Sequence, residues 1–308
     1  MIAQKDLRII FLGTPDFAVA SLKAMVDAGY NIVAVVTAPD KPAGRGQHLR
    51  PSAVKEYALL QNLPILQPER LKNKEFLSEL KSFQADLQVV VAFRMLPEAV
   101  WNMPPMGTFN VHGSLLPYYR GAAPINWAII NGETETGVTT FKLQHEIDTG
   151  DILLQHKEPI LPEDNMGTMY EKLMKAGAQL LLQTLETLRK DALSPIPQSS
   201  LDKETHAPKI YKEHCLIHWE NKAEAIHNLI RGLSPIPTAY TFLKEKQLKI
   251  YISRFVLENT ENTPGSVDSD GKSFLRFACS NGWLYALDLQ YEGKKRMPVE
   301  DFLRGFRF

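Results

Sequence analysis

Short apolar runs alternate with amphipathic stretches through the first half of the chain. The apolar runs are nearly continuous, which is typical of strands that are covered on both faces of a sheet. The stretches between them repeat apolar residues at helical spacing. This order predicts a Rossmann-like, mostly parallel α/β sheet with helices on both sides. The expected strands are residues 7–13, 31–37, 87–93, 107–113, 137–143 and 151–160, and the expected helices are 17–30, 51–62, 74–83 and 166–190.

The hydrophobic pattern changes after residue 190. Residues 191–207 are rich in Pro, Ser and charged residues, which is typical of a linker. Short alternating strands separated by turn residues then follow a single helical stretch, and this arrangement predicts a small OB-like β-barrel. The helix is expected at 221–233 and the strands at 239–243, 247–257, 273–279 and 282–291. The sequence therefore predicts a domain at 1–190, a linker at 191–207 and a domain at 208–308.

Composition narrows the class of protein only slightly. The 308 residues include 35 basic and 35 acidic side chains, so the net charge indicates neither nucleic acid nor membrane as a partner. Cys215 and Cys279 are too few for a disulfide framework. The first residues resemble no signal or transit peptide, and no apolar stretch reaches the roughly 18 residues of a membrane span. We expect a cytoplasmic protein.

The loops after the strands are the places where a parallel sheet binds ligands. The first of them, in "FLGTPDF" at residues 11–17, lacks the G-x-G-x-x-G pattern. Thr14 and Pro15 stand where the backbone would have to approach a pyrophosphate, which argues against a nicotinamide or flavin site. The later segments "FNVHGSLLP" and "EIDTGD" carry the remaining candidate polar residues.

Asn110 and His112 end an apolar strand two positions apart, so they project to the same face. An amide and an imidazole suit the stabilisation of an oxyanion with proton transfer nearby. Two satisfied structural polar residues at a strand end are the alternative, and spacing alone favours it. A carboxylate such as Asp148 would stabilise the imidazolium, but spacing does not show that it meets His112.

Other kinds of site find weaker support. Ser114 lacks the G-x-S-x-G pattern of a serine hydrolase. His214, Cys215 and His218 have a spacing that could bind zinc, but no second Cys/His pair accompanies them, and surface histidines are the favoured interpretation. The sequence therefore predicts no metal. A reaction in which the substrate brings its own nucleophile is consistent with this set of residues.

Two basic segments indicate a nucleic-acid contact when they are taken together. The first is a long Pro/Gly loop, residues 37–52, which carries Lys41, Arg45 and Arg50. Loops of this length inside compact domains are functional or disordered, and a solvated surface loop is the alternative. The second segment carries Lys294, Lys295 and Arg296 beside aromatic residues near the C-terminus.

The segments "NVHGSLLPYYRGAAP" and "EIDTGDIL" closely resemble the folate-dependent formyltransferases, whose hallmark is Asn-x-His, SLLP and an aspartate about 35 residues on. "FLGTPDFAV", "PDKPAGRG", "APKIYKEHCLIHW" and "GKKRMPVEDFLRGFR" extend the similarity over essentially the whole chain. The resemblance is to those members that formylate the methionine of initiator methionyl-tRNA. It implies 10-formyltetrahydrofolate as co-substrate, an OB-type tRNA-binding domain and a monomer.

The resemblance also implies roles for single residues. Asn110, His112 and Asp148 correspond to the catalytic trio. The folate-binding positions correspond to Ser114, Leu115, Leu116 and Pro117, with Val91 and Phe93 in the folate-pocket segment, and the loop with Lys41 and Arg45 corresponds to a tRNA-binding insertion. We also expect Arg50, Lys294, Lys295 and Arg296 to bind tRNA because of their positive charge. By this assignment Asn110 and protonated His112 stabilise the oxyanion, and Asp148 keeps His112 charged and assists proton transfer.

Two positions depart from the family pattern. "VAFRMLP", residues 91–97, is one residue shorter than the usual folate-pocket segment, and Glu146 replaces a common glycine beside Asp148. The active-site motifs are shared by formyltransferases that act on amino sugar nucleotides, so that acceptor is the alternative. A formyltetrahydrofolate hydrolase and a catalytically silent binding module also stay open, although the two basic segments favour tRNA.

Overall fold

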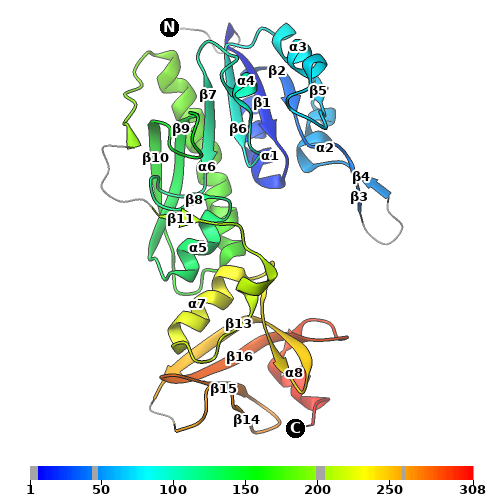
Figure 1. The fold of residues 1–308 in the computed structure, drawn as a ribbon, viewed down its shortest axis with the longest axis vertical. Coiled ribbons are helices and arrows are strands. Elements are labelled where there is room, and N and C mark those ends of the chain that lie inside the picture. Colours follow the sequence, from blue (N-terminus) through cyan, green and yellow to red (C-terminus); the bar gives the residue numbers. More distant parts are fainter. Residues whose placement is uncertain (1–5, 44–47, 199–204, 259–260, 308) are drawn as a thin grey trace. The chain divides into compact units, whose positions relative to one another are not determined.

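The computed structural model describes residues 6–43, 48–198, 205–258 and 261–307 (Figure 1). The chain forms two compact units that interleave along the sequence. The first unit comprises Met1–Gly121, Gly137–Glu158 and Glu171–His206, and the second comprises Ala122–Thr136, Pro159–Tyr170 and Ala207–Phe308. No helix among the described residues is both long enough and apolar enough to span a membrane.

The first unit is built on a seven-stranded sheet in the order β10-β9-β7-β6-β1-β2-β5. Its strands are β1 (Arg8–Gly13), β2 (Asn31–Val36), β5 (Ile65–Leu66), β6 (Leu87–Val91), β7 (Thr108–His112), β9 (Glu135–Lys142) and β10 (Ile152–Pro159). The pairs along β7-β6-β1-β2-β5 are parallel, and β9 pairs antiparallel with β7. The mostly parallel sheet confirms the fold class predicted from the apolar runs.

Helices connect these strands. They are α1 (Asp16–Asp27), α2 (Ala53–Leu60), α3 (Lys74–Ser82), α4 (Glu98–Trp101) and α6 (Met166–Arg189). Of these, α2 and α3 begin at side-chain caps. The Ser52 hydroxyl accepts a bond from the Lys55 amide, and the Asn73 side chain accepts one from the Glu75 amide. Each cap satisfies a donor that the first helical turn leaves unpaired.

Helices cover both faces of the sheet, so strand alternation decides which face each side chain occupies. One face packs against α3 and α4 through Ile10, Leu12, Val36, Val90, Phe76, Leu80 and Val100. On the other face α6 lies against β7, where a Cβ at Gly177 would come 3.1 Å from a methyl carbon of Val111. Asn110 and His112 flank Val111, so their side chains lie on the face opposite to α6.

The second unit is built on a six-stranded antiparallel sheet in the order β12-β13-β16-β15-β14, with β17 on β16. Its strands are β12 (Ala239–Leu243), β13 (Lys246–Leu257), β14 (Val267–Ser269), β15 (Leu275–Cys279), β16 (Gly282–Tyr291) and β17 (Met297–Pro298). The register of β13 against β16 shifts near Ile252, and such a bulge lets a long strand bend. This smaller antiparallel domain confirms the second half of the predicted fold class.

Helices close the core of the second unit. They are α5 (Pro124–Ile130), the 3-10 helix η3 (Lys212–Cys215), α7 (Ala223–Leu233) and α8 (Val299–Arg304). Ile226 and Ile230 of α7 are fully buried in one cluster with Leu248 and Leu284 of the sheet. The helix therefore contributes its apolar face to the core, as its helical spacing predicted.

Three details differ from the sequence-based expectation. The third expected strand ends at Val91, because Ala92 has a left-handed backbone with φ of 46°. The long basic loop contains a two-stranded ribbon, β3 (Lys41–Ala43) and β4 (His48–Arg50). Part of the expected linker also joins structured elements, since Ile196 pairs with Ile152, and β11 (His206–Ala207) pairs with β8 (Arg120–Gly121). The expected domain boundaries stay a prediction.

The alternation on β1 yields a stability prediction. Leu12 on β1 is fully buried against α3 and α4, whereas Leu60 at the end of α2 is 77% exposed. Leu12→Ala should lower the free energy of unfolding by about 2–5 kcal/mol through lost burial and a cavity. The matched control Leu60→Ala should change it by less than about 0.5 kcal/mol. Urea unfolding of both variants tests this, and equal losses would contradict the burial argument.

Candidate functional site

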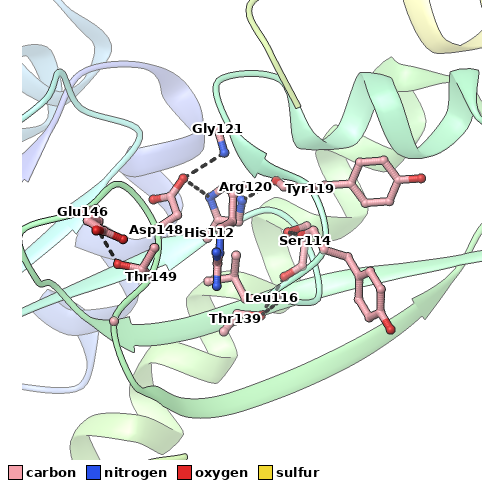
Figure 2. Close-up of polar contacts among 12 residues, drawn as sticks. His112, Ser114, Leu116, Tyr119, Arg120, Gly121, Thr139, Glu146, Asp148 and Thr149 are labelled. Atoms are coloured by element: carbon pink, nitrogen blue, oxygen red, sulfur yellow. Dashed lines mark hydrogen bonds and ion pairs between the residues drawn. The ribbon is translucent and has the colours of Figure 1, made fainter. Parts of the chain in front are cut away.

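The end of β7 and the loop between β9 and β10 bring together two of the predicted site residues. His112 Nδ1 lies 3.7 Å from Asp148 Oδ2 (Figure 2). The side chains are only 7% and 13% exposed. Asn110 lies two residues before His112 on the same face of β7. Among the described residues, none hydrogen-bonds the Asn110 side-chain amide, which leaves this amide open to a ligand.

The backbone of the following turn fixes the orientation of the imidazole. His112 Nε2 lies 2.9 Å from the carbonyl oxygen of Tyr119. A carbonyl oxygen only accepts, so Nε2 carries the proton and donates it. The other nitrogen, Nδ1, therefore faces the Asp148 carboxylate. The ring of Phe141 meets the imidazole edge-on, with 6.5 Å between the ring centres, and forms an apolar wall beside it.

Backbone geometry around Asp148 holds the carboxylate in place. Its Oδ2 accepts a bond of 2.9 Å from the Gly121 amide, so the carboxylate lies between this amide and His112 (Figure 2). Asp148 has a positive φ of 55°, a conformation that Asp adopts more readily than most residues. At Gly150 a Cβ would lie 1.6 Å from the Lys142 carbonyl oxygen. The shape of the loop therefore requires Gly150 and is compatible with an aspartate at position 148.

The SLLP segment forms a tight turn whose side chains point into the protein. Ser114 is fully buried, and its hydroxyl donates to the Tyr118 carbonyl at 2.6 Å. Leu116 packs against Phe141 and Ile152, and its bond to Pro117 is cis. These side chains shape the turn, so its backbone and the half-buried Leu115 are the parts that can reach a ligand.

Two polar residues that sequence reasoning missed hold this turn. The Thr139 hydroxyl donates to the Ser114 carbonyl at 2.7 Å and accepts from the Leu116 amide at 3.1 Å. The Gln155 side chain donates to the Leu116 carbonyl at 2.8 Å. Thr139 lies on β9 and Gln155 lies on β10. No local signal in the sequence links either residue to the turn.

The residues of the shortened "VAFRMLP" segment differ in their burial and in their contacts. Val91 is fully buried and Phe93 is half-buried. Arg94 donates hydrogen bonds to the carbonyls of Pro68 and Glu69, and its guanidinium lies 5.6 Å from the centre of the Phe93 ring. Glu146, the other departure, is exposed on the Asp148 loop.

The basic residues of the first unit lie on the β3–β4 ribbon. Lys41 and Arg50 are direct cross-strand partners, and both are exposed. In the part of the chain that the structure describes, neither forms an ion pair. Like charges placed opposite each other repel, so this pair would gain from a bound anion. Arg45 lies outside the described residues.

The basic residues of the second unit have different surroundings. Lys294 and Lys295 are exposed before β17. Arg296 pairs with Asp288, with Nε 2.7 Å from Oδ1, and its guanidinium lies 4.2 Å from the centre of the Tyr251 ring. Part of its charge is therefore already neutralised within the protein.

The candidate zinc ligands are His214, Cys215 and His218, and the structure shows the surroundings of each. His214 Nδ1 accepts a bond from the Tyr211 amide, and Cys215 is buried. His218 lies 3.4 Å from Glu220. Within the described ranges, no group of three or more His, Cys, Asp or Glu side chains is arranged to hold a metal ion.

Comparison with known proteins places this geometry in a family. A model described as "Formyl transferase" matches residues 7–185, and one described as "Formyl transferase, C-terminal domain" matches residues 209–307. A methionyl-tRNA formyltransferase of Bacteroides thetaiotaomicron is 50% identical over 312 residues, covering 99% of this chain and 97% of that protein.

Two solved structures share the fold at lower identity. HypX from Aquifex aeolicus in complex with tetrahydrofolic acid has a TM-score of 0.65 at 18% identity, over 97% of this chain and 48% of HypX. WlaRD, a sugar 3N-formyl transferase solved in the presence of dTDP and 5-N-formyl-THF, has a TM-score of 0.67 at 21% identity, over 94% of this chain and 99% of WlaRD. At these identities the likeness concerns the fold alone.

Both compact units are therefore accounted for by one family. The first family model includes β7, the SLLP turn and the Asp148 loop, and the second includes the antiparallel sheet. The similarity to the Bacteroides protein is spread over the full length of both chains. This chain belongs to the formyl transferase family and, within it, to the methionyl-tRNA formyltransferases.

Proposed function

We propose that this protein transfers the formyl group of 10-formyltetrahydrofolate to the α-amino group of methionine on initiator methionyl-tRNA. The observation that carries the proposal is the buried pair of His112 and Asp148 beside the open amide of Asn110. The acceptor is supported by the 50% identity to a methionyl-tRNA formyltransferase over the full chain. The likeness to HypX, whose structure contains tetrahydrofolic acid, supports a folate as the formyl donor.

The site suits a reaction in which the acceptor brings its own nucleophile. The methionine amine attacks the formyl carbon that N10 of the folate carries. Negative charge develops on the formyl oxygen, where hydrogen-bond donors stabilise the transition state. The carbon–N10 bond then breaks, the amine loses a proton and N10 gains one, so that tetrahydrofolate is the leaving group. We assign this role to the Asn110 amide and to the protonated ring of His112.

The orientation of the imidazole ring indicates which nitrogen of His112 is available to the substrate. Its Nε2 donates to the Tyr119 carbonyl, so Nδ1 is the nitrogen that can exchange a proton or donate toward the substrate. Asp148 lies on that side and is itself held by the Gly121 amide. We assign Asp148 to orienting the imidazolium and to assisting the transfer of the amine proton.

We assign folate binding to the SLLP turn and to the "VAFRMLP" segment. The side chains of Ser114 and Leu116 are buried, so they act by shaping the turn, whose backbone groups and Leu115 would contact the folate. Pro117 is the last residue of the SLLP turn and belongs to the same assignment. Val91 and the half-buried Phe93 would line the apolar part of the pocket.

We assign acceptor binding to the basic segments. Lys41 and Arg50 face each other without a carboxylate partner, which favours a phosphate between or near them. Lys294 and Lys295 are exposed, whereas Arg296 is already paired with Asp288 and should contribute less. A cytoplasmic monomer with domains at 1–190 and 208–308 completes the proposal.

The acceptor can be identified in one assay. The purified protein is incubated with 10-formyltetrahydrofolate and either methionyl initiator tRNA, an amino sugar nucleotide, or buffer alone. We expect tetrahydrofolate release only with the tRNA, together with formylation of its methionine. Release with the sugar nucleotide would support the alternative acceptor, and release in buffer would indicate a hydrolase.

The catalytic assignment predicts large and specific losses of turnover. Asn110→Ala and Asp148→Asn should each lower kcat by about 10² to 10³, because each removes a group that acts in the transition state. The KM for folate should change little. Glu146→Gln, an exposed residue of the same loop, is the matched control and should retain activity. An Asp148→Asn enzyme within tenfold of wild-type kcat would contradict the assignment.

The ribbon predicts a salt-dependent contribution to tRNA binding. Lys41→Gln combined with Arg50→Gln should raise the KM for tRNA and reduce the slope of log Kd against log salt by roughly 2, because about two phosphate contacts are lost. The matched control Lys23→Gln with Lys81→Gln removes two other exposed charges of the first unit. Equal effects in both double variants would show that only net charge matters.

A further inference from the structure

A buried side chain from the segment after α6 reaches the loop that carries Asp148. Gln198 is only 3% exposed although it lies among the prolines and serines of the expected linker. We propose that Gln198 is a positioning residue for formyl transfer, which fixes the backbone of the Asp148 loop and thereby the place of the carboxylate beside His112. This inference rests on the proposed function, but its central claim concerns the geometry of the loop.

The amide nitrogen of Gln198 clamps the loop on both sides of Thr149. Nε2 donates to the Asp148 carbonyl at 2.9 Å and to the Gly150 carbonyl at 2.7 Å. A primary amide has two N–H donors, so both are used on this loop. The two carbonyls bracket the residue that follows Asp148, and the clamp therefore restrains the backbone next to the carboxylate.

The amide oxygen of Gln198 is held by Arg120. Oε1 accepts bonds from Nε at 3.1 Å and from Nη2 at 2.7 Å. Because a guanidinium only donates, it forces the oxygen toward Arg120 and the NH₂ group toward the loop. The next residue, Gly121, donates its amide to the Asp148 carboxylate. Asp148 is thus held at its carbonyl and at its carboxylate by one connected network.

The Asp148 loop is irregular, whereas the segment that carries Gln198 is anchored to a strand. Asp148 has a positive φ, and residues 143–151 of its loop form neither a helix nor a strand. The segment that carries Gln198 is anchored two residues earlier, where Ile196 and Ile152 exchange backbone hydrogen bonds of 2.8 and 2.9 Å. A rigid anchor on β10 is therefore connected through one side chain to the loop at the site.

Gln198→Glu isolates the clamp from the packing. Glutamate has the same shape and can still accept from Arg120, but it has no N–H to give to the two carbonyls. We expect Gln198→Glu and Gln198→Ala each to lower kcat by about 10², because a small displacement of a catalytic group is costly. The KM values for folate and tRNA should stay within about threefold. Gln183→Ala, which removes an exposed glutamine of α6, is the matched control.

Amide hydrogen exchange tests the geometry without reference to activity. Exchange in residues 146–151 should be faster in both Gln198 variants than in wild type and in Gln183→Ala, at temperatures where all are folded. Unchanged exchange in Gln198→Glu would overturn the proposal. Faster exchange in a protein that formylates no methionyl-tRNA would instead refute the proposed function and leave the clamp in place.

A double variant separates positioning from a general structural role. If Gln198 acts through Asp148, Gln198→Glu should lower kcat little further in the Asp148→Asn background. Independent, additive losses would show that Gln198 acts elsewhere and would overturn the proposal. Should Gln198→Ala fail to fold, Gln198→Glu alone carries both tests, because it preserves the volume of the side chain.

Discussion

The Asp148 carboxylate lies between the imidazole of His112 and the backbone amide of Gly121, and the rest of the site depends on this contact. An acidic group that is 13% exposed needs compensating partners, since an unpaired buried charge is costly. Here the partners come from the end of β7 and from β8. The carboxylate therefore joins these two strands to the β9–β10 connection.

The parallel part of the sheet explains only half of this arrangement. The carboxyl ends of β6 and β7 lie at one edge. β9 runs antiparallel to β7, so the loop after Lys142 begins beside Phe109, near the start of β7, and reaches His112 through Asp148. Asn110 and His112 project from the face of β7 opposite to α6, because Val111 between them packs toward that helix. The SLLP turn is then fixed by Thr139 and Gln155 from the neighbouring strands.

The fold itself does not choose the acceptor. WlaRD shares the fold and is a sugar 3N-formyl transferase, so this fold occurs in a protein with another acceptor. The basic residues to which we assign tRNA binding belong to the exposed β3–β4 ribbon and to the segment before β17 in the second unit. Our proposal thus assigns chemistry and acceptor choice to different segments of the chain.

The sequence by itself determined the mostly parallel sheet, the antiparallel second domain, and the shared face of Asn110 and His112, because these follow from strand and helix periodicity. Family resemblance added Asp148. Only the tertiary structure decided that His112 directs Nδ1 toward Asp148, that Ser114 and Leu116 are buried, and that Gln198 reaches the loop. These contacts join residues up to 50 positions apart, and no local pattern encodes a hydrogen bond across such a separation.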